Sequence, residues 1–314
     1  MKENLLTHKK LSPELEKQAD KIFNDSIYPS LIRSKQPQDS PVGYVLGGQP
    51  GAGKSSLTKM IKDMEDFHEN VVVIDLDSFR KYHPEASALY EKYGTDAARF
   101  NHEFAAYISE KAVDRATSEG YNVIIEGTFR TAGKPIHDIS LLEERGYITG
   151  VAIIATPAEI SKKGLTDRKQ EEEKAGLQAR LTPLPHHDLV VDKLAENANI
   201  VFREKPTDKF FVFTRNGLIY DKNIHRGEPG EYINRELNKF NDNVLSSERS
   251  KEMDKARDSY NKITKIENID LKFIHEAENK LQEKRDSLIQ EQRKSKIQAN
   301  INTKNKNKQA DLEP

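Results

Sequence analysis

Short apolar runs alternate with stretches of helical periodicity through the first half of the chain. The apolar runs occupy residues 42–46, 71–74, 123–125 and 151–154. Apolar residues at helical spacing fill the intervals, up to Met64 and around 85–93, 96–119 and 135–145. Strands that are apolar throughout are buried on both faces, as in a parallel sheet covered by helices on both sides. The pattern predicts an α/β fold with a doubly wound parallel sheet.

Two further elements flank this alternating region. Before it, apolar residues fall at helical spacing over 11–27, with Ser12 as the expected N-cap and Pro13 at the first helical position. Pro29 is expected either to end this helix or to bend it. After the region, residues 209–220 form two apolar runs around an Asn-Gly pair, which predicts a β-hairpin.

The chain becomes strongly polar beyond the hairpin. Residues 231–299 keep helical patterns, and 300–314 form a Lys/Asn/Gln-rich tail that we expect to be disordered. Ile274, Leu281 and Leu288 fall seven apart, but three heptad positions are too few for a coiled coil, so a solvated helix or hairpin is favoured. The expected parts are an N-terminal helical segment, the α/β domain, a polar helical extension and the tail, at 1–40, 41–230, 231–299 and 300–314.

Composition limits the possible functions. The 314 residues are 35% hydrophobic, which can supply one good core but not two. Lys plus Arg (50) and Asp plus Glu (51) nearly cancel, so no global field attracts nucleic acid or an acidic membrane. The absence of cysteine excludes disulfides, thiolate metal sites and Cys nucleophiles. No run has the length of a signal peptide or a membrane span, so we expect a cytoplasmic protein.

A glycine-rich loop follows the first apolar run and opens onto a helix. It reads Gly48-Gln49-Pro50-Gly51-Ala52-Gly53-Lys54-Ser55 and has the GxxxxGK[ST] spacing of a phosphate-binding loop, or P-loop. Its backbone N–H groups and the positive end of the helix dipole favour a β-phosphate. Lys54 adds a positive charge between the β- and γ-phosphates, and the Ser55 hydroxyl is placed to hold Mg²⁺. A turn that binds nothing is disfavoured by the full spacing and its flanks.

These features predict ATP and Mg²⁺ as cofactors and a P-loop kinase-like domain over 41–230. The expected ATP site comprises Gly48, Gln49, Pro50, Gly51, Ala52, Gly53, Lys54, Ser55 and Ser56.

Carboxylates follow the second and third apolar runs. Asp75 and Asp77 come at the end of the second run and Glu126 at the end of the third. Because the carboxyl ends of parallel strands face the substrate crevice, Asp77 could accept a proton from a substrate hydroxyl, as phosphoryl transfer to an alcohol requires. Glu126 could bind substrate or order the water shell of Mg²⁺. The structural alternatives are a helix N-cap for Asp77 and a buried ion pair for Glu126.

With these motifs in order, the chain resembles the zeta toxin family, the bacterial kinases of toxin-antitoxin systems that phosphorylate UDP-N-acetylglucosamine. The resemblance covers roughly residues 10–220 and rests on four groups of residues. They are 47–55, 74–80 with His83-Pro84, 120–128, and Ala179-Arg180 with Thr182-Pro183 and His187-Asp188.

The resemblance implies a role for each matching residue. Asp77 matches the catalytic base, which takes the proton from the 3′-hydroxyl of the amino sugar. Lys54, Arg168 and Arg180 match groups that contact the phosphates, the two arginines from a lid whose planar guanidinium groups suit developing charge. The positions matching the lining of the sugar-nucleotide pocket are Arg80, Glu110, Glu126, Thr128 and Arg130. Phe129 sits where the family often has a smaller residue.

Simpler interpretations remain for several of these residues. Arg168 could pair with Glu172 on a solvated helix, Glu110 could be a solvated helix residue, and Arg80 and Arg130 could be surface charges. His83, His186 and His187 lack metal-ligand spacing, so we expect structural or capping roles for them.

Two classes of function remain open from the sequence. One is a kinase for UDP-N-acetylglucosamine or a related UDP-sugar, or for another nucleotide-type acceptor. The other is a nucleotide-binding interaction module without catalysis. A nucleic-acid acceptor is disfavoured because no basic stripe with interleaved aromatic residues is present. The family resemblance also implies a small helical antitoxin as a protein partner that covers the nucleotide site.

Overall fold

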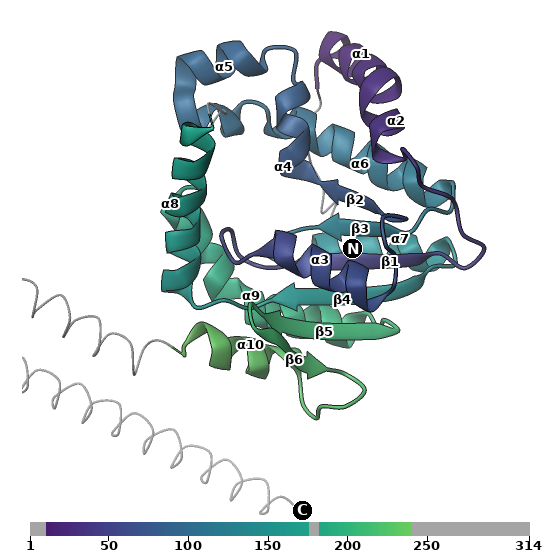
Figure 1. Cartoon of the computed structure of the whole chain (residues 1–314), viewed down its shortest axis with the longest axis vertical. Helices are drawn as coiled ribbons and strands as arrows, with labels where there is room; N and C mark the ends of the chain where they lie inside the picture. Colours follow the sequence, from purple (N-terminus) through teal and green to yellow (C-terminus); the bar gives the residue numbers. More distant parts are fainter. Residues whose placement is uncertain (1–10, 176–181, 240–314) are drawn as a thin grey trace, which may run out of the picture. The chain divides into compact units, whose positions relative to one another are not determined.

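A six-stranded sheet forms the centre of the computed structural model, which describes residues 11–175 and 182–239 (Figure 1). The strand order is β2-β3-β1-β4-β5-β6. The strands span Val42–Gly47 (β1), Val72–Asp75 (β2), Val123–Glu126 (β3), Ile148–Ile154 (β4), Lys209–Thr214 (β5) and Gly217–Asp221 (β6). The first five run parallel and β6 returns antiparallel beside β5. The predicted α/β fold and the predicted hairpin are confirmed.

Helices precede β1, connect each pair of consecutive parallel strands, and follow β6. They span Pro13–Ile22 (α1), Tyr28–Leu31 (α2), Lys54–Met64 (α3), Leu76–Phe79 (α4), Ala86–Tyr93 (α5), His102–Ser118 (α6), Gly133–Glu144 (α7), Ala158–Lys174 (α8), Leu184–Glu204 (α9) and Pro229–Leu237 (α10). Shorter turns span Phe23–Ile27 (η1), Arg80–Tyr82 (η2) and Gly94–Arg99 (η3).

The sheet buries both faces, as its apolar strands require. Alternate residues of each inner strand belong to two different core clusters; on β1, Val45 lies in one cluster and Tyr44 and Leu46 in the other. The larger cluster takes its helical residues from α1, η1, α2, α4, α6, α7, α9 and α10, whereas the smaller takes them from α3. Side chains of a strand alternate between faces, so these clusters identify the helix layer on each side of the sheet.

The N-terminal helix begins where the sequence predicts. The Ser12 hydroxyl accepts a hydrogen bond from Leu15 N at 3.3 Å and caps α1. A wide π-turn, η1, then leads into α2, which contains Pro29. The wider hydrogen bonding of η1 accommodates a residue that has no N–H to donate, so the helical path continues past Pro29 to Leu31. Phe23 and Tyr28 are buried in the larger core cluster, so this segment packs on the α/β domain.

Helix α10 crosses the predicted domain boundary at residue 230. Ile233 and Leu237 are buried in the larger core cluster, and Gly230 N donates a hydrogen bond to Asn199 Oδ1 at 2.7 Å. The α/β domain therefore continues past the predicted boundary, because the apolar face of α10 completes its core. The predicted polar extension from 240 onward, its heptad positions and the tail lie outside the described residues.

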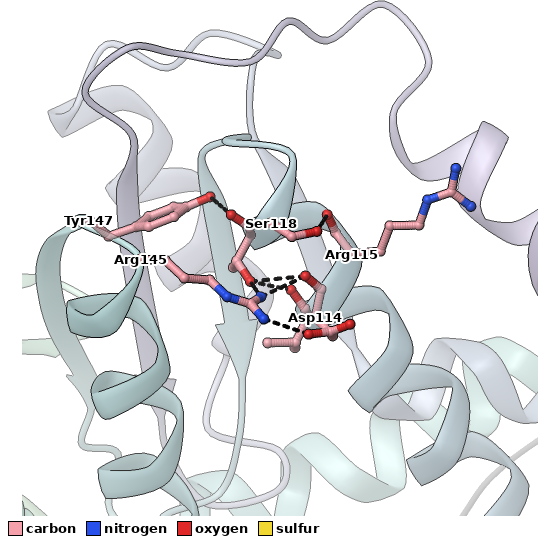
Figure 2. Close-up of polar contacts among 7 residues, drawn as sticks. Asp114, Arg115, Ser118, Arg145 and Tyr147 are labelled. Carbon is pink, nitrogen blue, oxygen red and sulfur yellow. Dashed lines mark hydrogen bonds and ion pairs between the residues drawn. The ribbon is translucent and has the colours of Figure 1, made fainter.

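A polar network connects α6 with the turn before β4, at the amino-terminal end of that strand (Figure 2). Arg145, in the turn before β4, donates to the Asp114 carboxylate at 2.5 Å and the Asp114 carbonyl at 2.6 Å, and also to the Thr117 hydroxyl. The Tyr147 hydroxyl donates to Tyr121 O at 2.7 Å. These contacts lie at the opposite end of β4 from its carboxyl end. Within the described part of the chain, no helix combines the length and apolar character needed to cross a membrane.

Candidate functional site

The predicted phosphate loop joins β1 to α3 at the carboxyl edge of the sheet. Strand β1 ends at Gly47 and α3 begins at Lys54, with Gly53 as its N-cap. Gly51 and Gly53 have φ of 78° and 105°, a conformation that residues with a Cβ atom rarely adopt. The loop therefore has the strand–loop–helix context that the GxxxxGK[ST] motif requires. The first backbone N–H groups of α3 could bind an anion there.

Helix α8 approaches this loop closely. A Cβ atom at Gly51 would lie 2.1 Å from the Ser161 carbonyl oxygen, and one at Gly164 would lie 2.8 Å from the Gly51 carbonyl oxygen. Two glycines thus allow the backbones of the loop and of α8 to touch. The position of α8 is tied to the shape of the phosphate loop.

Lys54 lies in a cluster of charged groups. Its Nζ atom is 3.3 Å from the Gly48 carbonyl oxygen. Burial lowers the pKa of Lys54 from its ordinary value. The negative charges of Glu126, Asp77 and Asp75, in decreasing order of effect, oppose that shift. The ends of β1, β2 and β3 therefore bring the P-loop lysine and all three predicted carboxylates into one electrostatic unit.

Glu126 is a partly buried carboxylate of this cluster. Burial raises the pKa of its carboxyl group, and the hydrogen bond that the Thr58 hydroxyl donates at 2.7 Å acts in the opposite direction. The nearby charge of Asp75 raises the pKa further, while Lys54 lowers it. Glu126 therefore sits beside Lys54 with one oxygen oriented by α3, which matches both its predicted ligand role and its alternative as a buried ion-pair partner.

Asp77 lies in the first turn of α4 and is exposed. Asp75, one residue before the helix, is the N-cap: its side chain accepts a hydrogen bond from Asp77 N at 3.0 Å. The capping role considered for Asp77 thus belongs to Asp75. The Asp77 carboxylate lies 2.7 Å from the Nε atom of Arg80.

Arg80 is held on several sides. Its guanidinium group donates to Ala98 O at 2.6 Å and to Asn101 Oδ1 at 2.9 Å, and it lies 3.4 Å from His102 Nδ1. Its side chain is only 14% exposed, so it is not the surface charge considered from the sequence. The structure brings Arg80 to Asp77.

The loop after β3 carries Thr128, Phe129 and Arg130. Phe129 has φ of 56°, an uncommon conformation for a bulky residue, and its ring packs where a Cβ atom of Gly47 would be. Asn197 of α9 donates to the carbonyl oxygens of Phe129 and Arg130, both at 2.8 Å. Strain of this kind persists only where the surroundings enforce it and is typical of functional loops.

His186 is influenced both by Arg130 of this loop and by Asp77. Burial lowers the pKa of His186, the positive charge of Arg130 lowers it further, and the Asp77 carboxylate opposes the shift. His186 at the start of α9 therefore lies within electrostatic reach of both Arg130 and Asp77. Thr128 accepts a long hydrogen bond from Arg130 N at 3.4 Å.

The remaining predicted residues divide into three cases. Arg168 on α8 lies 3.9 Å from Glu172, the predicted pair, and its positive charge makes a minor contribution to the lowered pKa of Lys54. Glu110 lies on the exposed face of α6, where its charge raises the pKa of Asp138 on α7 after the larger effect of burial. Arg180 lies outside the described residues.

Sequence reasoning missed two anchoring residues. Arg215, in the turn of the β5–β6 hairpin, donates to Gly51 O at 2.7 Å and to Ala52 O at 3.2 Å. Asn197 holds the loop after β3 from α9, a helix that the sequence reading did not predict. Their partners are 164 and 68 residues away in the chain, so no local motif marks them.

The site fits ATP and Mg²⁺ by its donor set. The glycine-rich turn, the start of α3, Lys54 and the exposed Ser55 present N–H, ammonium and hydroxyl groups at one place. The described residues contain no group of three or more His, Asp or Glu side chains that could hold a metal ion. Mg²⁺ is commonly held by one or two protein oxygens together with phosphate oxygens and water, a pattern that Ser55 fits.

Known proteins match most of the described part of the chain. The family model for zeta toxin matches residues 29–225. The toxin PezT of Streptococcus pneumoniae serotype 4 is 35% identical over 194 residues, which cover 61% of this chain and 76% of that protein. Toxin zeta of Streptococcus pyogenes is 32% identical over 227 residues, or 71% of this chain and 78% of the relative.

A solved structure gives the same result. A chain from the PezAT chromosomal toxin-antitoxin system of Streptococcus pneumoniae superposes with a TM-score of 0.63 at 27% identity, covering 74% of this chain and 90% of that one. The matched region contains the phosphate loop and the carboxylates that follow β2 and β3. The chain therefore belongs to the zeta toxin family.

Proposed function

We propose that the protein is an ATP-dependent kinase that phosphorylates the 3′-hydroxyl of the amino sugar of UDP-N-acetylglucosamine or a related UDP-sugar. The observation that carries this proposal is the placement of the phosphate loop with Lys54, of Asp75 and Asp77, and of Glu126 at the carboxyl ends of the neighbouring strands β1, β2 and β3. A phosphate-binding lysine beside carboxylates able to accept a proton is the arrangement that phosphoryl transfer to an alcohol needs.

Each residue has a defined task in this reaction. Asp77 accepts the proton of the attacking hydroxyl, and Arg80 holds its carboxylate in place. Lys54 and the lid arginines Arg168 and Arg180 stabilise charge that develops on the transferred group. ATP is the phosphoryl donor, and Ser55 would hold Mg²⁺, which would neutralise charge on the phosphate oxygens.

The acceptor side is assigned to Glu110, Glu126, Thr128 and Arg130, with Arg80 at its edge. The identity of the acceptor rests on family membership. The buried, positive-φ Phe129 between Thr128 and Arg130 supports a shaped loop there, because its conformation is fixed by Asn197. A sugar nucleotide offers hydroxyl and phosphate oxygens to such a loop.

The biological role follows from the same relatives. We infer that the protein acts as the toxin of a toxin-antitoxin pair in the cytoplasm and is restrained by a small helical antitoxin that covers the nucleotide site. The similar structure from the PezAT toxin-antitoxin system supports this role.

A panel of acceptors tests the reaction. Purified protein is incubated with ATP, Mg²⁺ and individual UDP-sugars, and mass spectrometry identifies which sugar nucleotide gains one phosphate. We expect UDP-N-acetylglucosamine or a close relative to gain it at the amino sugar. Equal ATP turnover with and without every sugar nucleotide would contradict the proposal and favour a nucleotide-binding module without transfer; phosphate on another nucleotide-type acceptor would leave a kinase with a different substrate.

A further inference from the structure

A chain of buried polar side chains connects the phosphate loop with α8 and α9. The Gln49 side-chain amide lies within hydrogen-bond distance of the Thr156 carbonyl oxygen and 3.4 Å from Ser161 Oγ. Ser161 Oγ in turn lies 2.8 Å from His187 Nε2. The side chains of Gln49, Ser161 and His187 are all fully buried. The connection therefore runs through the interior, where each polar group depends on its neighbours.

Two neighbouring residues on each helix form the contact between α8 and α9. Alongside the Ser161–His187 contact, His187 Nδ1 lies 2.9 Å from Asp188 Oδ1, and the same oxygen lies 3.1 Å from Lys162 Nζ. Hydrogen bonds from His187 and then Lys162 lower the pKa of Asp188, so its carboxylate is ionised at neutral pH. We call these four residues, Ser161, Lys162, His187 and Asp188, the α8–α9 clasp.

In the clasp, Asp188 fixes the orientation of the His187 ring. An ionised Asp188 can only accept, so His187 Nδ1 carries a proton and the ring orientation is fixed. Nε2 then meets the Ser161 hydroxyl. Because Ser161 is fully buried, it has no access to a substrate and does not act as a nucleophile. The Ser-His-Asp order is thus a structural link in this protein.

The face of α8 that the clasp holds is the face that meets the phosphate loop. Ser161, Gly164, Leu165 and Arg168 have the spacing of one helix face over about two turns. Gly164 touches the Gly51 backbone, Leu165 lies against the same glycine, and the charge of Arg168 acts on Lys54. A displacement of Ser161 would move Arg168 with it, because a helix transmits the shift along its axis.

We propose that His187 is a positioning residue that holds α8 in register with the phosphate loop, so that Arg168 reaches the transferred phosphoryl group. This rests on the proposed kinase function for its effect on rate, whereas its effect on α8 itself is independent of the acceptor. His187 touches no substrate and acts only through Ser161.

Two substitutions separate the links of the clasp. His187→Gln can place an amide near the Nε2 position and keep the contact with Ser161, whereas His187→Asn can place one near the Nδ1 position and keep only the contact with Asp188. We expect the Asn variant to lower kcat about tenfold to a hundredfold, as misplacement of a charged group by about 1 Å can do. The KM for ATP should stay within about twofold, and the Gln variant should recover most of the rate.

Hydrogen exchange gives a readout that does not need an acceptor. With ATP and Mg²⁺ present, the backbone amides of α8 in the Asn variant should exchange faster than in the wild type and the Gln variant. His225→Gln is the matched control: His225 Nδ1 accepts from Asp221 N at 3.0 Å in the turn after β6, so its loss should alter neither kcat nor exchange in α8.

The outcomes separate the two proposals. If the wild type phosphorylates no acceptor, the kinase assignment fails, and exchange in α8 still decides the clasp. If the Asn and Gln variants match each other in both kcat and exchange, or lose rate only in proportion to the unfolded fraction, the clasp has no positioning role and the inference is overturned.

Discussion

The Nε atom of Arg80 lies 2.7 Å from Oδ1 of Asp77, within one turn of the same short helical segment. The Nη1 atom of Arg80 donates to the Ala98 carbonyl oxygen and to Asn101 Oδ1, and Nη2 lies 3.4 Å from His102 Nδ1. A carboxylate held by an anchored arginine points in a fixed direction. Arg80 therefore has two possible tasks, orienting the base or contacting the acceptor, and kinetics can separate them.

Substitution of Arg80 by lysine tests the orienting task. A lysine has one nitrogen and cannot satisfy Asp77, Ala98 and Asn101 together. We expect kcat to fall about tenfold or more while the KM for the acceptor stays within about twofold, because the lost interaction serves the transition state and not binding of the acceptor. Steady-state kinetics with the identified acceptor would measure both constants.

Arg145→Ala controls for lost stability in that experiment. It removes the Arg145 contacts drawn in Figure 2, at the far end of β4, and should cost about 2 kcal/mol of unfolding free energy, as expected for hydrogen bonds to a charged group, without lowering kcat. A rise in acceptor KM with unchanged kcat in Arg80→Lys would assign Arg80 to substrate binding.

Glu126→Gln should separate stability from activity. Burial raises the pKa of Glu126 in the folded protein, so this group contributes stability below its unfolded pKa and that contribution is lost as the pH rises through its folded pKa. At pH 7.5 the neutral amide should therefore raise the free energy of unfolding, whereas near pH 4 the two proteins should be equally stable. Urea unfolding at both pH values measures this difference.

The same variant should transfer phosphate at least about tenfold more slowly, because Lys54 loses its main nearby negative charge and the acceptor side loses a ligand. A variant that is less stable than the wild type at pH 7.5 would show that Glu126 serves mainly as the ion-pair partner of Lys54.

Gly51→Ala should disrupt the contact between the phosphate loop and α8. The new Cβ atom would lie 2.1 Å from the Ser161 carbonyl oxygen, so α8 must move. Gly146→Ala is the matched control, since Gly146 has φ of 74° against 78° for Gly51 but has open space around it. The control should cost about 1–2 kcal/mol from the backbone conformation alone and leave ATP binding intact.

Calorimetric titration with ATP measures the difference between these glycine variants. The expected result is loss of ATP binding in Gly51→Ala and retention in Gly146→Ala. Equal affinity in both would mean that the loop and α8 separate at no cost to the nucleotide site.

Arg215 should affect the KM for ATP, because it holds two carbonyl groups of the phosphate loop. Its two donated hydrogen bonds fix Gly51 and Ala52 so that the N–H groups of the loop face the anion. Arg215→Ala should raise the KM for ATP about tenfold, in the range expected for lost charge-assisted hydrogen bonds. Arg215→Lys keeps the charge but loses the fork, and we expect an intermediate KM; a lysine variant equal to the wild type would reduce the role of Arg215 to a general positive charge.

The strands and the phosphate loop could be predicted from the sequence because their signals are local. An apolar run marks each buried strand, and the GxxxxGK[ST] spacing marks the turn between β1 and α3. The cap at Ser12 was equally local. Helices α8 and α9 were not predicted as elements. Helix α8 is largely polar and has few buried residues, so its apolar pattern is weak.

The contacts that organise the site could not be predicted in this way. Arg215 reaches Gly51, Asn197 reaches Phe129, and His187 reaches Ser161 only because the fold brings distant segments together. The sequence suggested a structural role for His187 without identifying its partner. Arg80 was expected to line the acceptor site, and only the structure revealed its ion pair with Asp77.

The most direct test of the central claim compares the wild type with Asp77→Asn in transfer of phosphate from ATP to UDP-N-acetylglucosamine. Asparagine can still accept the hydrogen bond from Arg80, so the fold and ATP binding should persist while the base is lost. We predict a fall in rate of about a hundredfold to ten-thousandfold at unchanged ATP affinity, the usual contribution of a general base. A variant that phosphorylates the sugar nucleotide as fast as the wild type would contradict it.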